Sequence, residues 1–576
     1  MNAFDLTDVL TGGAGPNSVA AALRVSSDHR IDPATGAIGI TRTLEGEAVL
    51  EPIALEVTFD LDELVLHSLT GGRSDSAVPP TTFARHARRI HPRADAPGRP
   101  YLAALSRLDL GSDCGRSSGG DMPFFLLTDP GSTHGLWFAI GHSGSWRAVL
   151  SKSATHPASY RLQVRVGDGD MHLEPGERVV LPTVWVGEFR GDGWAALRAH
   201  LEASAPRVHV PWTVFNTWFG DDAAIDAQRL IAHAEVAAEV GVEAFVVDAG
   251  WYETPPGDRG EFMSAGLGTW TPDPVRFPDG LESVADRVRE LGMTFGLWFE
   301  PERAHPDSYV ARAHPEWLRT VPTSPWAMVD FGIEAVRRWA VDTIDAAVSA
   351  WSLGWIKWDM NHARPSEYWS GDPVAELSHC RGVWWVLDEI RRRNPGLVIE
   401  GCASGGHRID IEMVRRCDTF WISDQTVNSD TTRHIVRQAA RLLPAQYRYL
   451  SIAPAADPGS TPPYPDEWFV GACNGVFGLM DVLADWPDDL RHRVAAHIDR
   501  FRSVRHLLGA HVVDLSDRPD GDRPLAGWEA WEMSDASGEA ALVALRVESP
   551  DATREFRGTR TWTVELPPGG ATLRHI

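Results

Sequence analysis

Between residues 213 and 480, short apolar runs alternate with longer amphipathic stretches, and this alternation strongly restricts the fold. Short apolar runs bounded by turn residues are typical of buried strands. In the stretch 335–352, apolar residues recur at spacings of three and four, as in a helix that packs one face on a sheet. The strand candidates number eight: 213–219, 244–249, 294–300, 355–359, 397–402, 419–424, 449–452 and 475–480.

Eight strand–helix units in succession predict a closed (β/α)8 TIM barrel. An open doubly wound sheet is disfavoured because no GxGxxG turn follows the first strand. Residues before this region form short alternating runs broken by Gly, Pro, Asp and Ser, and alternation returns near the end of the chain. We therefore predict a multidomain chain: an N-terminal β-sandwich at 1–206, the catalytic barrel at 207–508 and a small C-terminal antiparallel β-domain at 509–576.

The composition restricts partners and compartment. A formal net charge of −25 disfavours nucleic acid and anionic membranes as partners. No apolar run is long enough to span a bilayer, and the first residues lack the basic start and apolar core of a signal peptide, so we expect a cytoplasmic protein. Five cysteines without a close pair, and no HExxH motif, lead us to expect no cofactor and no metal site. A homo-oligomer is compatible with the sequence.

Polar and aromatic residues gather at the predicted strand ends, where barrel enzymes carry their chemistry. Residues 355–361 read WIKWDMN and place Asp359 at a strand end beside Lys357, while Asp424 closes another apolar run. Two carboxylates from two strand ends are the minimal apparatus of a glycosidase. Further candidates at strand ends are Trp218, Asp248, Trp251, Trp298, Glu300, Glu302, Asn361, Cys402, Gly405 and Arg408.

Several of these residues also have a purely structural explanation. An aspartate at a strand end often caps the next helix, which applies to Asp359. Glu300 and Glu302 would then belong to structural ion pairs, and Arg408 would pair with Asp410 on the surface. We favour the functional interpretation because the whole set would rarely occur together at random strand ends.

Four stretches carry a family resemblance: 297–302 (LWFEPE), 357–361, 401–408 and 421–424. They resemble, in order and at similar spacing, the signature of glycoside hydrolase family 36. This family includes bacterial α-galactosidases, α-N-acetylgalactosaminidases and raffinose-synthase-type transferases. The resemblance implies an N-terminal β-supersandwich, a catalytic barrel and a C-terminal β-domain, which agrees with the independent reading of the pattern.

By position, the resemblance implies that Asp359 is the nucleophile and Asp424 the general acid/base of a retaining α-glycosidase. For substrate binding it implies that Lys357 bonds sugar hydroxyls, Asp248 holds those at C4 or C6, Trp298 lines the pocket, Cys402 and Gly405 lie near the 2-hydroxyl, and Arg408 supports the site. From their places at strand ends we add Trp218, Trp251 and Asn361 as substrate-binding residues.

The sequence departs from the family in the part that recognises the sugar. The second strand usually ends in Asp-Asp-Gly-Trp, but here Ala249 follows Asp248, so one carboxylate is missing. A lost charged hydrogen bond to a sugar hydroxyl weakens binding by roughly 1.5–3 kcal/mol. We therefore predict an α-galactosidase-like enzyme acting on small carbohydrates. An α-N-acetylgalactosaminide or α-glucoside substrate and a transglycosidase remain alternatives. A non-catalytic carbohydrate-binding protein would lack one of the two acids, and both are present.

Overall fold

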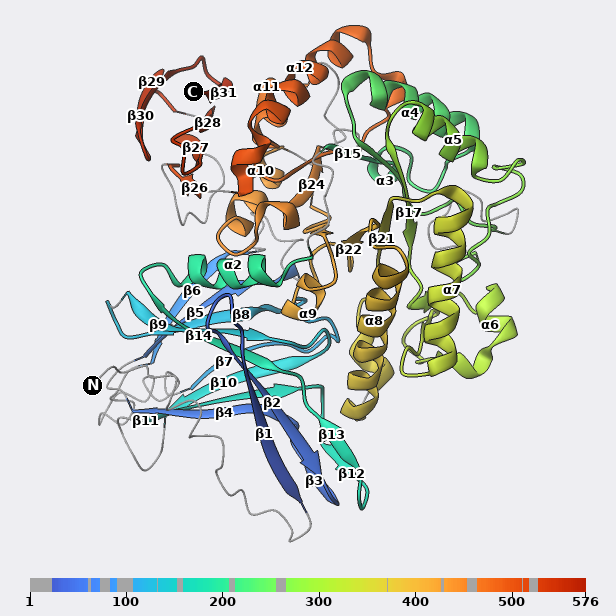
Figure 1. The fold of residues 1–576 in the computed structure, drawn as a ribbon, viewed down its shortest axis with the longest axis vertical. Helices are drawn as coiled ribbons and strands as arrows, with labels where there is room; N and C mark the ends of the chain where they lie inside the picture. The colour runs from blue at the N-terminus through green and yellow to red at the C-terminus, as the bar shows by residue number, and fades with distance from the viewer. Residues whose placement is uncertain are drawn as a thin grey trace.

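The computed structural model describes residues 23–60, 64–72, 83–90, 107–131, 133–152, 159–206, 213–254, 266–369, 371–425, 429–452, 464–509, 511–516, 527–547 and 549–576. Three groups of sheets follow one another along the chain (Figure 1). Antiparallel sheets near the N-terminus, in blue and cyan, lie below a parallel sheet surrounded by helices. A small group of antiparallel strands, in red at the upper left, lies above the N-terminal sheets and beside the helices of the barrel. This arrangement confirms a multidomain fold that contains a TIM barrel.

The central sheet is a nearly closed parallel barrel of eight strands. Neighbouring strands in the sheet follow chain order, and β25 pairs in parallel with β15. An isolated parallel bridge between Trp421 and Tyr449 joins the two remaining edges. The strands are β15 (Thr213–Asn216), β16 (Ala244–Val247), β17 (Thr294–Phe299), β21 (Trp355–Trp358), β22 (Val398–Gly401), β23 (Thr419–Phe420), β24 (Tyr449–Ile452) and β25 (Val476–Leu479).

Most of the predicted strands are too long at their ends, and the first also continues into a different element. The expectation of a strand over 213–219 is wrong beyond Asn216, because Trp218 and its neighbours form the short helix α3 (Trp218–Asp221). The side-chain oxygen of Asn216 accepts a hydrogen bond from the backbone N–H of Trp218 at 2.9 Å and turns the chain out of the strand.

Helices cover the outside of the barrel. In α7 the buried positions include Val336, Ala340, Ile344 and Ala347, so the spacing of three and four predicted from the sequence puts one apolar stripe on the barrel. The longer helices are α2 (Gly193–Ser204), α4 (Ala227–Val240), α5 (Glu282–Glu290), α7 (Glu334–Trp351), α8 (Pro373–Arg393), α10 (Ser429–Ala439) and α12 (Asp488–Val504), and the short ones are α6 (Tyr309–Ala313), α9 (Ile411–Val414) and α11 (Asp466–Gly471). Short strands β18 (Arg303–Ala304), β19 (Leu318–Arg319) and β20 (Ala327–Val329) form a separate sheet beside the barrel.

Two antiparallel sheets near the N-terminus pack face to face over one apolar core. Phe125 and Phe138 stack in it at 4.8 Å between ring centroids, and Leu150 and Val164 of the other sheet belong to the same cluster. The larger sheet runs β1 (Arg24–Ile31), β2 (Ile38–Glu45), β14 (Val184–Arg190), β9 (His134–Ile140), β8 (Asp121–Thr128), β5 (Leu64–Thr70) and β6 (Arg85–Ile90), with β13 (Arg178–Val180) also on β2. The smaller runs β4 (Ile53–Asp60), β11 (Ser159–Val166), β10 (Trp146–Lys152) and β7 (Arg107–Ser112), and β12 (Met171–Leu173) pairs with β3 (Ala48–Leu50).

The last strands form a small antiparallel sheet and a hairpin with their own apolar cluster around Trp528, Phe556 and Trp562. The sheet contains β26 (His511–Asp514), β27 (Gly527–Ser534), β28 (Ala540–Val547) and β31 (Ala571–His575), and the hairpin contains β29 (Thr553–Arg557) and β30 (Thr561–Glu565).

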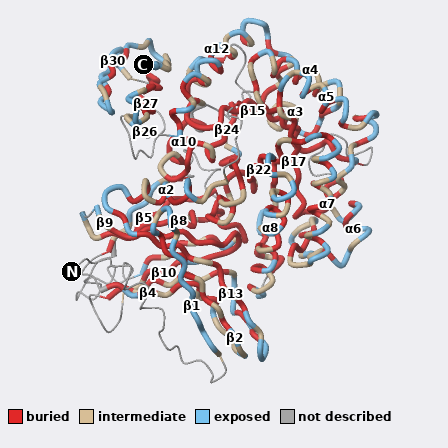
Figure 2. Tube along the Cα trace, in the orientation of Figure 1, coloured by how far each residue is buried: buried red, intermediate tan, exposed pale blue. Residues whose placement is uncertain are grey.

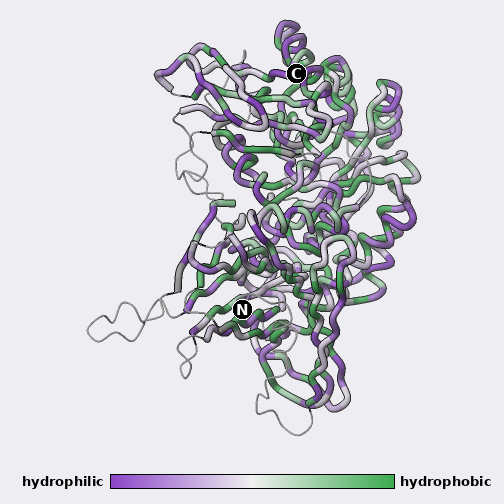
Figure 3. Tube along the Cα trace, turned by 60° about the vertical axis from the view of Figure 1, so that its left-hand side comes forward, coloured by the Kyte–Doolittle hydropathy of each residue, from purple (hydrophilic) through white to green (hydrophobic). Residues whose placement is uncertain are grey.

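Burial follows the sheets. In Figure 2 the buried segments run through the strands of each group, while exposed segments lie on outer helices and strand edges. Figure 3 shows hydrophilic stretches frequent along the outer turns. No helix among the described residues combines the length and apolar character that crossing a membrane requires.

Candidate active site

Asp359 lies just beyond the end of β21 and is held by donors from three directions. Its Oδ2 accepts hydrogen bonds from Nε1 of Trp298 at 3.0 Å and from Nδ2 of Asn361 at 2.7 Å. Its Oδ1 accepts from the backbone N–H groups of Met360 at 2.8 Å and Ser404 at 3.4 Å. None of these donors belongs to a helix, so the helix-capping explanation for Asp359 is wrong.

The surroundings of Asp359 keep it ionised. Burial raises the pKa of this carboxyl, but the nearby Lys357 cation lowers it, as do hydrogen bonds from Cys402, Asn361 and Trp298. The lowering effects win, and the pKa of Asp359 lies below its usual value. An ionised carboxylate is the form that a nucleophile requires.

Lys357 and Asp248 form a buried ion pair beside Asp359. Nζ of Lys357 lies 2.8 Å from Oδ2 of Asp248, which also accepts from Nδ2 of Asn216 at 2.7 Å. Burial lowers the pKa of Lys357, but Asp248 raises it, and the net pKa lies well above the usual value. The ammonium group also lies 5.6 Å from the ring centroid of Trp421, within the range of a cation–π contact.

The pKa of Asp424 is shifted in the opposite direction from that of Asp359. Burial raises its pKa, a 2.7 Å hydrogen bond from Nε1 of Trp421 lowers it, and the negative charge of Asp359 raises it again, to about 6. Asp424 is also exposed to solvent. A carboxyl that holds its proton near neutrality beside an ionised one is the arrangement of a glycosidase acid and nucleophile.

Glu400 adds a carboxyl that is neutral at pH 7. It is fully buried next to Lys357 on the neighbouring strand. Its Oε2 accepts a hydrogen bond from Nε1 of Trp355 at 2.8 Å. Burial raises the pKa of Glu400 to about 8, although Lys357 and Trp355 lower it.

Arg408 lies behind the site and is engaged by Glu302. Its guanidinium donates two hydrogen bonds to that carboxylate, at 2.8 and 2.7 Å. Nε1 of Trp358 donates to the same carboxylate at 2.7 Å, and Nε2 of His379 lies 3.0 Å from it. The surface pair of Arg408 with Asp410 is therefore wrong. Both terminal nitrogens of Arg408 bond Glu302, which fits the supporting place that the resemblance implies, and its part in substrate binding stays a prediction.

Glu300 is likewise paired with an arginine. Its Oε2 lies 2.6 Å from Nη2 of Arg303, and it accepts hydrogen bonds from Asn361. Burial raises the pKa of Glu300 to about 7, against the lowering effect of Arg303, while the charge of Asp359 raises it further. The contacts thus support the ion-pair explanation of both Glu300 and Glu302.

Two of the predicted tryptophans differ in their surroundings. Trp251 is fully buried, and its indole N–H donates to the backbone carbonyl of Trp298 at 2.9 Å. Trp251 therefore packs against and supports Trp298, and its contact with substrate stays a prediction. Trp218 is half-buried at the start of α3.

Cys402 and Gly405 bring the loop after β22 close to both acids. The Cys402 thiol is a hydrogen-bond donor to Asp359. Gly405 has φ +81°, and a Cβ there would lie 2.9 Å from the backbone nitrogen of Asp424. A glycine is required for this close approach and this backbone conformation.

Sequence reasoning missed Arg116, which reaches the same loop from the N-terminal sheets. Its Nη1 donates to Oγ of Ser404 at 3.2 Å and to the carbonyl of Ala403 at 3.4 Å. Nothing in the stretch CGRSSGG at 114–120 signals this contact, because it joins residues almost three hundred positions apart.

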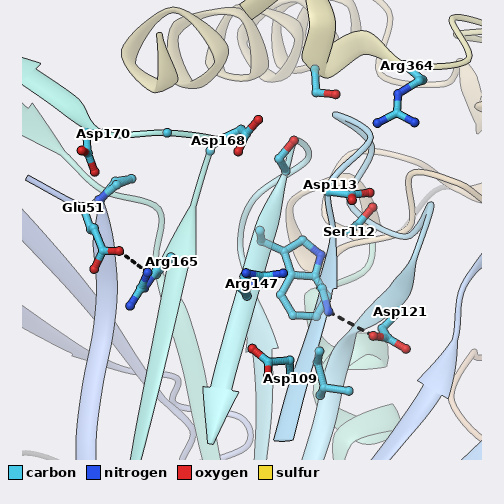
Figure 4. A pocket seen from close by; sticks show the side chains of 18 of the residues that line it. Glu51, Asp109, Ser112, Asp113, Asp121, Arg147, Arg165, Asp168, Asp170 and Arg364 are labelled. Atoms are coloured by element: carbon cyan, nitrogen blue, oxygen red, sulfur yellow. Dashed lines mark hydrogen bonds and ion pairs between the residues drawn. The ribbon is translucent and has the colours of Figure 1, made fainter. Parts of the chain in front are cut away.

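A separate cleft of about 610 Å³ lies between the smaller N-terminal sheet and the 3-10 helix η5 (Pro365–Trp369) (Figure 4). Acidic side chains and the arginines Arg147, Arg165 and Arg364 line it. Glu51 pairs with Arg165 there. Neither Asp359 nor Asp424 borders this cleft, so the candidate active site is the barrel end. Within the part of the chain that the structure describes, no cluster of His, Cys, Asp or Glu side chains could hold a metal ion.

Comparisons with known proteins identify similar chains. A family model described as Melibiase matches residues 192–510. Alpha-galactosidase C of Emericella nidulans is 29% identical and covers 97% of this chain and 76% of its own length. Alpha-galactosidase AgaA of Geobacillus stearothermophilus is 29% identical over 77% of this chain and 63% of its own length.

Solved structures share the fold. The galactosidase domain of the alpha-galactosidase-sucrose kinase AgaSK superposes with a TM-score of 0.80 at 21% identity, covering 96% of this chain and 80% of that one. A variant of AgaA from Geobacillus stearothermophilus in complex with 1-deoxygalactonojirimycin gives a TM-score of 0.79 at 20% identity, covering 96% and 82%.

Proposed function

The chain belongs to the Melibiase family and is a glycoside hydrolase, and we propose that it releases terminal α-linked galactose from small glycosides with retention of configuration. The names of the curated relatives support the α-galactoside as substrate. The observation that carries the mechanism is the opposite tuning of two carboxyls at one barrel end. The pKa of Asp359 is lowered, whereas that of Asp424 is raised to about 6.

In the proposed first step, the Asp359 carboxylate attacks the anomeric carbon while Asp424 donates its proton to the departing glycosidic oxygen. The bond between the anomeric carbon and that oxygen breaks, and a covalent glycosyl-enzyme forms. In the second step Asp424, now ionised, accepts a proton from water, and the resulting hydroxide displaces Asp359 from the sugar. Two inversions at one carbon give net retention.

Lys357 and Asp248 are proposed to bind sugar hydroxyls, because both are polar, buried and adjacent to the nucleophile. Trp298 would line the pocket, with Cys402 and Gly405 near the 2-hydroxyl. We also propose the domain limits 1–206, 207–508 and 509–576, which are supported by the three groups of sheets.

One observation favours a second sugar. Ala249 stands where a carboxylate would grip the sugar, and its side chain is fully buried, so other protein atoms occupy the space around it. An α-N-acetylgalactosaminide or an α-glucoside is therefore the alternative substrate, with the same two acids. A transglycosidase would also use these acids and would differ only in the acceptor.

A panel of p-nitrophenyl α-glycosides tests the sugar: galactose, N-acetylgalactosamine, fucose, glucose and xylose, with β-L-arabinopyranose. Turnover of the galactoside supports the main proposal, and turnover of another sugar with the galactoside inert assigns Ala249 to altered specificity. NMR of the first-formed anomer tests retention, and sugar product analysis separates hydrolysis from transfer. Asp359→Asn is expected to abolish turnover without unfolding the protein, and near-normal activity in that variant would refute the mechanism.

A further inference from the structure

The loop between β7 and β8 is bound tightly to the loop that follows β22. Ser118 accepts a backbone hydrogen bond from Ile409 at 2.7 Å and donates to the carbonyl of Gly406 at 2.7 Å, both through Oγ. Its backbone N–H donates to the carbonyl of His407 at 2.9 Å. A Cβ on Gly72, which follows β5, would meet the ring of His407 at 1.8 Å, so a second N-terminal segment also lies close to the loop after β22. The N-terminal sheets thus fix the position of a loop that borders the candidate active site.

Arg116, in the same loop, contacts the barrel loops that carry the site. Its side chain is buried, and it spans two barrel loops at once. Nη2 donates to the carbonyl of Ala363, beyond Asp359, at 3.2 Å. Nη1 donates to the carbonyl of Ala403 at 3.4 Å and to Oγ of Ser404 at 3.2 Å. One guanidinium therefore clamps the loop after β21 to the loop after β22.

A chain of hydrogen bonds runs from Arg116 to the carboxylate of Asp359. Because Oγ of Ser404 accepts from Arg116, its proton is free to point at Oδ1 of Asn361, 3.0 Å away. The Asn361 amide then presents Nδ2 to Oδ2 of Asp359 at 2.7 Å. Ser404 also donates its backbone N–H to Oδ1 of Asp359, and it holds this place with φ +48°. A non-glycine residue in the left-handed region persists only where its surroundings fix it.

The direction of this chain matters for the charge at Asp359. An arginine can donate hydrogen bonds but cannot accept them, so it can stand only at the donor end of such a chain. Each following group then accepts from the group before it and donates to the group after it. If the Asn361 amide turned over, its oxygen would face the carboxylate and repel it. The guanidinium thereby favours the orientation in which a donor faces Asp359, together with Oε2 of Glu300, which also accepts from Nδ2 of Asn361 at 3.2 Å.

We propose that Arg116, which lies outside the barrel, is a positioning residue for the proposed nucleophile Asp359, acting through Ser404 and Asn361. This inference rests on the proposed function. It assigns the N-terminal sheets a part in the chemistry of the barrel.

Kinetics over a pH range tests the inference, with any p-nitrophenyl α-glycoside that the wild-type enzyme turns over. Arg116→Met keeps the length of the side chain and removes its donors, whereas Arg116→Lys keeps a charged donor. Ser404→Ala interrupts the chain from the barrel side. Ser117→Ala is the matched control, because Ser117 in the same loop donates to Asp410 at 2.7 Å without joining the chain.

We expect Arg116→Met and Ser404→Ala to lower kcat about tenfold, which corresponds to about 1.4 kcal/mol, with KM little changed. In both variants the acid limb of kcat/KM should move to higher pH, because Asp359 loses an oriented donor. Arg116→Lys should recover part of kcat, and Ser117→Ala should keep wild-type kcat and pH profile. None of these substitutions replaces a titratable group that faces Asp359, namely Lys357, Glu300, Glu400, Cys402, His407 and Asp424. Arg116→Met also removes the cation that lowers the pKa of His407, whereas Ser404→Ala leaves that cation in place.

The double variant of Arg116→Met and Ser404→Ala should resemble each single variant, since both interrupt one chain. Wild-type kcat and an unmoved acid limb in Ser404→Ala would overturn the inference, even if Arg116→Met fails to fold. An equal loss of kcat in Ser117→Ala would also overturn it, because a general loosening of the loop would then suffice. An active Asp359→Asn variant would instead refute the proposed function itself, so the two failures are distinguishable.

Discussion

Removal of the Lys357 cation is expected to affect stability and catalysis together. In Lys357→Met the chain keeps its length and volume, but the carboxylate of Asp248 loses its partner at 2.8 Å. Both side chains are only 4% exposed, so water cannot replace the ammonium group. Asp248 would be left as a buried charge with hydrogen bonds alone.

The structure sets the size of the effect. At an effective dielectric constant of about 20, two charges 2.8 Å apart attract by about 6 kcal/mol. Part of this attraction offsets the desolvation of the pair, and removing one partner of a buried pair costs about 3–5 kcal/mol. For a large domain this corresponds to a fall in Tm of roughly 6–20 °C. Because the pKa of Lys357 is raised, this group stays charged below about pH 10, and the pair contributes wherever Asp248 is ionised.

Thermal unfolding at pH 6 measures this loss against Arg338→Met as the control. Arg338 pairs with Glu334 across one helical turn, and their side chains are 69% and 65% exposed, so this pair is expected to contribute less than about 0.5 kcal/mol. The acid limb of kcat/KM should also move to higher pH in Lys357→Met, because Lys357 lowers the pKa of Asp359. Equal Tm values for the two variants, with the acid limb unmoved, would refute the claim that the Lys357–Asp248 pair stabilises the protein and that Lys357 lowers the pKa of Asp359.

Three further results are expected. In the wild-type enzyme kcat/KM should fall about tenfold per pH unit above about pH 6, since Asp424 acts only while protonated; a plateau to pH 8 would contradict this. Trp298→Phe removes the indole N–H that donates to Asp359 at 3.0 Å. A hydrogen bond to a charged group contributes about 1.5–3 kcal/mol, so kcat/KM should fall about tenfold to a hundredfold. Unchanged kinetics would contradict a role of this bond in catalysis. Ala249→Asp should lower Tm relative to Ala249→Ser, because position 249 is fully buried. Equal Tm values, with a higher activity on α-galactoside in Ala249→Asp, would contradict this prediction.

Strand positions in the barrel could be predicted from the sequence because each strand is a short apolar run with a polar residue after it. All eight predicted strands are present, but most end earlier than predicted. The overrun is longest at 419–424, where the strand ends at Phe420. The type of element is wrong at Trp218 and Phe219, which are apolar and follow a strand, yet belong to a helix and are only half-buried. Apolar character did not reveal the backbone turn that Asn216 sets.

Within the site, neighbours on one strand could be predicted and partners across the barrel could not. Lys357 and Asp359 are two positions apart and lie on the same strand end. The partners of Arg408, in contrast, depend on which strand ends become adjacent. The nearby Asp410 was a plausible partner, but Glu302, 106 positions away, is the one that bonds it. No local pattern encodes such a choice.

The contacts made by the loop between β7 and β8 have a consequence for how this enzyme can be divided. Residues 192–510, which carry the family match, contain both acids. An excised segment of this length would leave the N–H of Ile409 and the carbonyls of Gly406 and His407 without the partners that Ser118 supplies. Unpartnered backbone groups destabilise the loop that carries them. The barrel therefore cannot be moved to another protein by itself. The loop between β7 and β8 has to be transferred with it.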